Sequence, residues 1–170
     1  QGDYYSIVME YVDGFSLKEI IESKGPLPID ITVFIISLIC DALDYIHKEG
    51  IFHRDIKSSN IMLSYEGEVK LGDFGISSNL QDDQSSMVTQ AGQILGTPAY
   101  LPPEIIEGEK GVAAYDSKSD IYSLGVVLYE TLIGQQPFGE GSYATIINKI
   151  TNSRYVDIDK APVVIPKKLK

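Results

Sequence analysis

The sequence predicts an α+β fold that is mainly helical and carries one small β-hairpin. Two segments, residues 31–47 and 120–130, are long and largely apolar, as buried helices are. Residues 61–71 form two short apolar or alternating runs around a turn sequence, which is typical of a hairpin. With 170 residues and 44 % hydrophobic content, the chain can bury one core, so we expect one domain or part of one.

Shorter elements complete the expected order along the chain. Residues 4–11 are rich in Tyr, Ile and Val and precede Gly14, as a strand that enters a turn would. Residues 17–23 are expected to form a short helix, and residues 143–150 begin another. In the hairpin, Gly67 marks the turn between the two strands.

The two long helices have recognisable ends. The first, residues 31–47, follows a proline-containing stretch and stops before Gly50, an order of proline and glycine that helices prefer. His47 near its end is expected to face the helix dipole and not to act as a ligand. The second helix opens at Asp120, whose carboxylate is expected to cap free N–H groups. Because this helix is apolar on nearly every face, we expect it to be central and buried.

One array of polar residues predicts phosphoryl transfer. It reads His53-Arg54-Asp55-Ile56-Lys57-Ser58-Ser59-Asn60, followed by Asp73-Phe74-Gly75. Moving a phosphoryl group to a hydroxyl needs a carboxylate that orients the hydroxyl and accepts its proton, and Asp55 suits this task. Lys57 supplies a cation for the phosphate oxygens. Asn60 and Asp73 offer the hard oxygen ligands that Mg²⁺ prefers, and the hairpin would bring them together.

This array resembles the catalytic loop and metal-binding motif of the protein kinase family, H-R-D-x-K-x-x-N followed by D-F-G. The resemblance implies a protein-kinase-like fold, ATP and Mg²⁺ as cofactors, and a catalytic loop at residues 53–60. It makes Met9 the gatekeeper behind the adenine and lets the Glu10 and Val12 backbones bond the adenine edge, although a plain edge strand has the same composition. It also assigns Met62 to the nucleotide site.

The resemblance gives supporting roles to residues around the array. His53 and Phe74, which precedes Gly75, are expected to pack together in a hydrophobic spine, so we expect structural support from them and not proton transfer. Asp120 is expected to hold the backbone of the catalytic loop near His53 and Arg54. It is an organising residue in this interpretation and not a catalyst.

A polar stretch after Asp73 resembles an activation segment, residues 73–104. In such kinases the arginine beside the catalytic Asp pairs with a phosphorylated loop residue, because an arginine fork matches phosphate geometry. Our hypothesis is that Thr89, or less favourably Ser85 or Ser86, is phosphorylated and docks on Arg54. The alternative is that these hydroxyls only solvate a loop.

The end of this segment narrows the substrate class. Residues 96–104 read G-T-P-A-Y-L-P-P-E, which is similar to the peptide-positioning element of serine/threonine kinases. Tyrosine kinases usually lack a lysine two residues after the catalytic Asp, so Lys57 and Thr97 together favour protein substrates with Ser or Thr acceptors. By the resemblance, Thr97 would bridge Asp55 and Lys57.

The resemblance covers the last N-lobe strand and hinge, residues 1–13, and a truncated C-lobe, residues 14–170. The rest of the N-lobe and the last C-lobe helices are expected to lie outside this chain. Glu104 would then lack the arginine that pairs with it in this family, and an unpaired buried carboxylate costs roughly 3 to 5 kcal/mol. We therefore expect the isolated residues to be poorly stable and inactive, although the gene product would be an active kinase.

Composition excludes several other classes of protein. The formal charge is −10 and basic residues cluster only at residues 167–170, which argues against nucleic-acid or anionic-membrane partners. Cys40 is the single cysteine, so an internal disulfide is excluded, a reducing compartment fits, and a buried structural thiol is expected. The longest apolar tracts are too short and too interrupted to span a bilayer. A cytoplasmic domain is expected, although flanking sequence could anchor the full protein.

Three functions compete for this chain. The leading one is an active serine/threonine kinase most like the bacterial eukaryotic-type (Hanks-type) enzymes. Kinases that act at the upper levels of eukaryotic MAP-kinase cascades are the nearest alternative for the subfamily. The second is a pseudokinase or scaffold, which would need a lost lysine or glutamate in the N-lobe. The third is a small-molecule kinase, which would not need residues 96–104. A homodimer for trans-autophosphorylation is compatible with the first.

Overall fold

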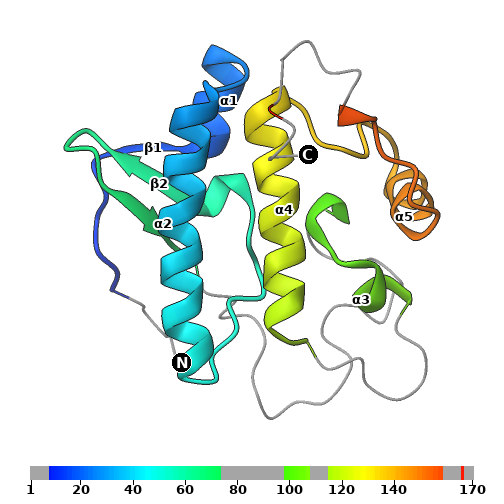
Figure 1. The fold of residues 1–170 in the computed structure, drawn as a ribbon, viewed down its shortest axis with the longest axis horizontal. Helices are drawn as coiled ribbons and strands as arrows, with labels where there is room; N and C mark the ends of the chain where they lie inside the picture. The colour runs from blue at the N-terminus through cyan, green and yellow to red at the C-terminus, as the bar shows by residue number, and fades with distance from the viewer. Residues whose placement is uncertain (1–7, 74–97, 108–114, 159–165, 167–170) are drawn as a thin grey trace, which may run out of the picture.

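The computed structural model describes residues 8–73, 98–107, 115–158 and 166. The described elements follow one another as β1 (Gly14–Ser16), α1 (Leu17–Lys24), α2 (Ile29–Lys48), η1 (Ser58–Asn60), β2 (Ile61–Ser64), β3 (Val69–Leu71), η2 (Pro98–Tyr100), α3 (Pro103–Glu107), α4 (Ser117–Ile133) and α5 (Tyr143–Thr151), where η marks a short 3₁₀ helix. Helix α4 runs through the middle, with α2 and the sheet on one side and α3 and α5 on the other (Figure 1). The expected mainly helical α+β architecture is therefore found.

The sheet is antiparallel and has the order β1-β2-β3. Strands β2 and β3 form the expected hairpin, with Ile61 opposite Leu71 and Leu63 opposite Val69. Gly67 lies in its turn with φ +86°, a left-handed conformation that glycine adopts without strain. Because Gly72 follows β3 directly and donates its N–H to the Asn60 carbonyl at 2.9 Å, the hairpin returns the chain to the end of the catalytic loop.

The strand expected at residues 4–11 is wrong over its described part. Residues 8–11 have no regular structure, and Val8 and Tyr11 are 97 % and 85 % exposed. A strand needs a neighbour for its backbone N–H and C=O groups, and none of the described strands pairs with residues 8–11. The first described strand is β1, where the chain meets β2.

Helix α1 begins with a capping box formed by Ser16 and Glu19. Ser16 accepts a hydrogen bond from the Glu19 N–H at 3.2 Å, and the Glu19 carboxylate accepts one from the Ser16 N–H at 2.8 Å. This reciprocal capping box satisfies two N–H groups that a helix start leaves open, and it lowers the pKa of Glu19 through the hydrogen bonds from Ser16. The short helix expected at residues 17–23 is confirmed.

Helices α2 and α4 pack against each other and carry much of the core. On α2 the buried residues Ile35, Ile39 and Leu43 repeat at four-residue spacing, so one stripe faces α4. Cys40 follows Ile39 by one residue, which turns it about 100° away from that stripe, and its thiol is exposed. The expectation of a buried cysteine is therefore wrong.

Helix α4 is central and mostly buried, as expected, but its cap differs from the prediction. Asp116 accepts hydrogen bonds from the N–H groups of Lys118 and Ser119 and is the N-cap. Asp120 lies one turn further in, which frees its carboxylate for the contacts described below. Among the residues that the structure describes, no helix combines the length and apolar character that a bilayer crossing demands.

Candidate active site

The catalytic loop joins α2 to β2 and folds around the Asp55 side chain. Asp55 Oδ2 accepts a hydrogen bond from Lys57 Nζ at 2.7 Å and another from Asn60 Nδ2 at 3.0 Å. The same Asn60 nitrogen donates to the Asp55 carbonyl at 2.9 Å. Because Asn60 uses its nitrogen here, its Oδ1 is the atom left to act as a ligand. The three residues thus form one compact group, with Asp55 partly exposed for an acceptor hydroxyl.

Asp73 reaches the same place from the hairpin. It has φ +54°, a left-handed conformation that is uncommon for a residue other than glycine and that is often found at functional sites. Gly72, which precedes it, donates to the carbonyl of Asn60. The hairpin therefore brings Asn60 and Asp73 to one edge of the sheet, as the sequence indicates.

A cavity of about 430 Å³ collects the residues that the sequence assigns to nucleotide and metal. Its lining includes Met9, Glu10, Tyr11, Val12, Ser59, Asn60, Met62, Lys70, Leu71, Gly72 and Asp73. One wall is the segment before β1 and the opposite wall is the hairpin. Lys70 Nζ, on the hairpin, joins the two walls through its 2.5 Å ion pair with Glu10, and it also pairs with Glu68 of the hairpin at 3.1 Å.

The oxygen atoms in this cavity fit a magnesium ion. Asn60 and Asp73 supply an amide oxygen and a carboxylate, and Mg²⁺ characteristically takes one or two such protein ligands beside water and phosphate oxygens. Within the described residues, no group of three or more His, Cys, Asp or Glu side chains is arranged to hold a metal by itself. A metal bound here would thus take its remaining ligands from a nucleotide and from water.

The His53 ring connects the catalytic loop to Gly72, the residue before Asp73. Its side chain is fully buried, its Nε2 lies 3.0 Å from the Gly72 carbonyl, and its Nδ1 accepts the Asp55 N–H at 3.3 Å. An accepting Nδ1 requires the proton to sit on Nε2, which then donates to Gly72. Burial lowers the pKa of His53 below 6.5, so the neutral ring is favoured. This arrangement fixes the His53 ring between the loop backbone and the carbonyl of Gly72.

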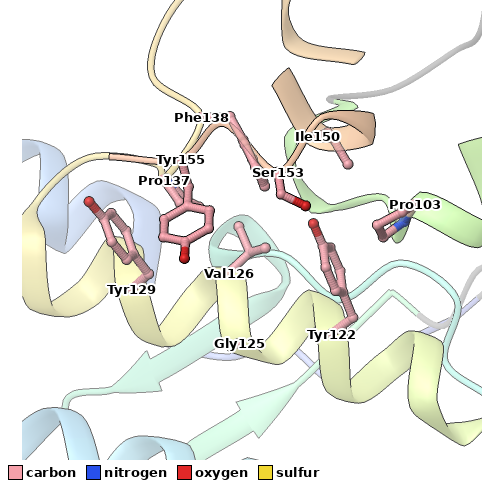
Figure 2. A pocket seen from close by; sticks show the side chains of 10 residues that line it. All are labelled: Pro103, Tyr122, Gly125, Val126, Tyr129, Pro137, Phe138, Ile150, Ser153 and Tyr155. Carbon is pink, nitrogen blue, oxygen red and sulfur yellow. The ribbon is translucent and has the colours of Figure 1, made fainter. Parts of the chain in front are cut away.

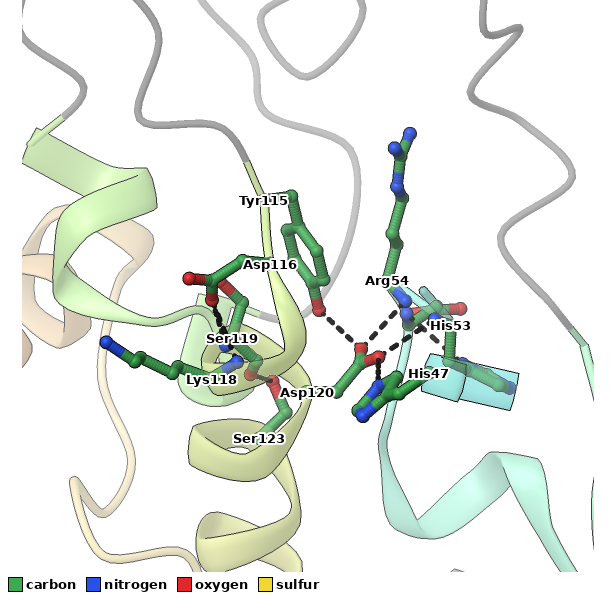
Figure 3. A network of polar contacts seen from close by, with 10 residues as sticks. His47, His53, Arg54, Tyr115, Asp116, Lys118, Ser119, Asp120 and Ser123 are labelled. Carbon is green, nitrogen blue, oxygen red and sulfur yellow. Dashed lines mark hydrogen bonds and ion pairs between the residues drawn. The ribbon is translucent and has the colours of Figure 1, made fainter. Parts of the chain in front are cut away.

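Asp120 holds the loop backbone from α4 (Figure 3). Its carboxylate is fully buried and accepts the N–H of His53 at 2.9 Å and of Arg54 at 3.0 Å. Arg54 has φ +66°, so these bonds fix a strained backbone next to Asp55. The contact that the resemblance implies for Asp120 is therefore present in the structure.

Two further partners of Asp120 were missed by sequence reasoning. His47 Nε2 lies 2.8 Å from Oδ2, and the Tyr115 hydroxyl donates to Oδ1 at 2.9 Å. Burial, and then the charge of Asp120, raise the pKa of Tyr115. His47 thus joins α2 to α4, and does not simply face the end of its helix. No local sequence signal predicts either contact, because both depend on how the helices pack.

The remaining assigned residues fall into two groups. Phe74, Gly75, Thr89 and Thr97, with Ser85 and Ser86, lie outside the described residues. Glu104 is described, but it is exposed and accepts a 3.4 Å hydrogen bond from the Ser119 hydroxyl. The penalty expected for a buried, unpaired Glu104 therefore does not apply, because water can solvate an exposed carboxylate.

A second cavity, of about 400 Å³, lies between α4 and the segments around α3 and α5 (Figure 2). Its described lining is mainly aromatic and apolar and consists of Pro103, Tyr122, Gly125, Val126, Tyr129, Pro137, Phe138, Ile150, Ser153 and Tyr155. None of these side chains is a carboxylate, an imidazole or an ammonium group. The groups that phosphoryl transfer needs are instead gathered around Asp55.

Comparison with known proteins agrees with the geometry. Residues 1–168 match the family model described as "Protein kinase domain". The serine/threonine-protein kinase PknB of Mycolicibacterium smegmatis is 48 % identical over 132 residues, which cover 78 % of this chain and 20 % of that protein. The PknB of Mycobacterium leprae is 46 % identical over 132 residues, with the same coverage of 78 % and 20 %.

These relatives confirm the expected likeness to bacterial eukaryotic-type kinases. The chain spans about a fifth of the length of the curated relatives it matches. The family match, in contrast, extends over nearly the whole chain. The chain therefore belongs to the protein kinase family.

Proposed function

We propose that this chain is the hinge and most of the C-lobe of an ATP-dependent serine/threonine protein kinase. In this proposal residues 1–13 belong to the end of the N-lobe and the hinge, of which residues 8–11 are hinge and not strand, and residues 14–170 supply a truncated C-lobe. The observation that carries the proposal is the compact group of Asp55, Lys57 and Asn60 beside the cavity that also holds Asp73. The names of both relatives support a Ser or Thr acceptor.

The mechanism assigns one task to each residue of the group. Asp55 orients the acceptor hydroxyl of a protein substrate and takes its proton. Lys57, 2.7 Å from Asp55, places a positive charge where the transferred phosphoryl oxygens pass. Asn60 Oδ1 and the Asp73 carboxylate would hold magnesium. When bound, ATP and Mg²⁺ supply the transferable phosphoryl group and neutralise its charge.

Nucleotide binding and control complete the proposal. Met9, Glu10, Val12 and Met62 line the cavity where the adenine would lie, with Met9 as gatekeeper. A phosphorylated Thr89 docked on Arg54 would order the activation segment. The partners would be cytoplasmic proteins with Ser or Thr acceptors, and a homodimer would allow trans-autophosphorylation.

The test compares the complete reading frame with its Asp55→Asn variant at saturating Mg²⁺ and ATP. We expect label from γ-labelled ATP on protein serine or threonine, and a loss of about 100- to 10,000-fold in the variant, because the proton acceptor is removed. Asp44→Asn is the matched control, since Asp44 is exposed on α2 and contacts only Lys48 among the described ion pairs. It should keep full activity.

Two outcomes would favour the other functions. Absence of label in both proteins would favour a pseudokinase or scaffold. Consumption of ATP that depends on Asp55 but leaves proteins unlabelled would favour a small-molecule kinase. Mapping the labelled sites by mass spectrometry would also show whether Thr89 carries phosphate.

A further inference from the structure

The hydroxyl of Tyr100 lies at the centre of a buried hydrogen-bond cluster. It donates to Glu130 Oε2 at 2.7 Å, lies 3.0 Å from the Ser58 hydroxyl and accepts from Gln136 Nε2 at 3.0 Å. Tyr100, Ser58 and Glu130 are 8 %, 0 % and 7 % exposed. Three separate parts of the fold therefore meet at one phenol oxygen on η2.

The direction of these bonds follows from the chemistry of a phenol. Tyr100 has a single O–H, and the Glu130 carboxylate takes it, because a carboxylate can only accept. Ser58 must then donate its own proton to the Tyr100 oxygen, as Gln136 does. Burial, followed by the charge of Glu130, raises the pKa of Tyr100, so the phenol stays protonated. The cluster has one satisfied arrangement, which makes it a rigid connection.

The cluster links the catalytic loop to the segment that resembles the peptide-positioning element. Ser58 follows Lys57 and opens η1, and η1 ends at Asn60, whose amide binds Asp55. Tyr100 is held from its other end as well, since the Ser123 hydroxyl on α4 donates to its carbonyl at 2.8 Å. A shift of Tyr100 would therefore move η1, and with it Asn60 and the Asp55 side chain that Asn60 binds.

We propose that Ser58 and Tyr100 are positioning residues that couple binding of the protein acceptor to the geometry of Asp55 and Asn60. The inference rests on the proposed kinase function and adds two residues that touch neither nucleotide nor acceptor hydroxyl. Seating a peptide against the segment that contains Tyr100 holds η1 in place through the Tyr100–Ser58 bond. Phosphoryl transfer is then fast when the protein acceptor is bound.

The experiment uses the complete protein with Ser58→Ala, Tyr100→Phe, and the two changes together. Each single change should lower kcat for a Ser/Thr peptide about tenfold, because each removes the hydrogen bond between Ser58 and Tyr100. The double variant should fall little further than the worse single one, since both changes break the same link. KM for ATP should change less than twofold, because none of the cavity-lining residues is Ser58 or Tyr100.

Tyr129→Phe is the matched control. Tyr129 lies on α4 as Glu130 does, but its hydroxyl donates to the exposed carbonyl of Val156, away from the catalytic loop. Its kcat should stay within twofold of wild type. If Ser58→Ala and Tyr100→Phe lower the melting temperature but leave kcat at the wild-type value, the cluster is merely structural and the inference is overturned.

Amide hydrogen exchange separates this inference from the proposed function. Residues 55–60 should exchange faster in Ser58→Ala and in Tyr100→Phe, and at the wild-type rate in Tyr129→Phe, whether or not the protein phosphorylates peptides. If the wild type is inactive but residues 55–60 exchange faster in Ser58→Ala and Tyr100→Phe than in the wild type, the proposed function is contradicted and the link between the segments stands. Unchanged exchange at residues 55–60 would overturn the link itself.

Discussion

The Asp120 carboxylate contacts four groups in and beside the catalytic loop. Oδ1 accepts from the Arg54 N–H and the Tyr115 hydroxyl, while Oδ2 accepts from the His53 N–H and contacts His47. All four partners face a carboxylate with no solvent exposure. A neutral amide of the same shape could not serve them, because one of its two atoms is a donor.

We therefore expect Asp120→Asn to lower the free energy of unfolding by about 2 to 3 kcal/mol and kcat by at least tenfold. Either orientation of the amide points an NH₂ group at a backbone N–H, which leaves the loop beside Asp55 unheld. Calorimetric unfolding and peptide kinetics of the complete protein would measure both effects. A variant as stable and as active as wild type would show that Asp120 does not organise the loop.

Asp116→Asn is the control at the same helix start. Asp116 caps α4 through the N–H groups of Lys118 and Ser119, and asparagine caps helices about as well as aspartate. The change should cost less than about 0.5 kcal/mol. The same substitution four residues apart thus separates a capping carboxylate from one that needs its second acceptor oxygen.

At this scale the sequence identifies residue types and not partners. The order and spacing around Asp55 predict a proton acceptor, a cation and two candidate metal ligands, because that chemistry uses few residue types. The contacts of His47 with Asp120 and of Ser58 with Tyr100 span 73 and 42 residues. They depend on how α2, α4 and the loops between them pack, which no local pattern encodes.

At the scale of elements, local sequence signals predict correctly those elements whose stabilising contacts lie close in the sequence. The short helix expected at residues 17–23, the turn at Gly67 and the long helix expected between a proline-containing stretch and Gly50 are all elements that the structure contains. Residues 8–11 do not follow their β-rich composition, because a strand is completed by a partner and not by its own sequence. Cys40 shows a related limit, since an apolar helix can still present one side to solvent.

The junction of β1 and β2 depends on a glycine without a side chain. A Cβ added to Gly14 would lie 2.0 Å from the Leu63 carbonyl oxygen and 2.7 Å from the Ser64 Cα, and both are backbone atoms that cannot rotate away. We expect Gly14→Ala to destabilise the protein by about 1 to 3 kcal/mol, because β1 must move off β2. Since β1 follows the wall of the cavity where we propose that the nucleotide binds, we expect KM for ATP of the complete protein to rise as well.

Gly125→Ala provides a control of opposite sign. Gly125 lies inside α4, and an added Cβ would meet no atom within 4 Å. Alanine there should stabilise the helix by about 0.5 to 1 kcal/mol through its higher helix propensity. Urea denaturation of both variants would test the pair, and equal stability of Gly14→Ala and wild type would contradict the close approach of the strands.

At the scale of the whole molecule, α4 is the frame that holds both the catalytic loop and η2. It holds the catalytic loop through Asp120 and holds Tyr100 through Glu130 and Ser123. Its apolar composition predicts its central place, because a helix that is apolar on most faces must be covered on most faces. The two polar attachments of Tyr100 are not predictable in this way, since they are isolated polar residues in an apolar segment.

The described residues complete only part of a phosphoryl-transfer site. Asp55, Lys57, Asn60 and Asp73 are gathered, but the sequence contains no G-x-G-x-x-G loop to cover phosphates and no V-A-I-K-like lysine to anchor them. Charge neutralisation at the phosphates is a large part of catalysis in this family. We therefore expect these 170 residues alone to show no ATP turnover above a protein-free blank, and we expect the complete reading frame to be active. Coupled measurement of ADP release from both proteins at equal concentration decides the point. Turnover by the short chain that disappears on Asp55→Asn would mean that the catalytic loop and Asp73 suffice without a phosphate-covering loop.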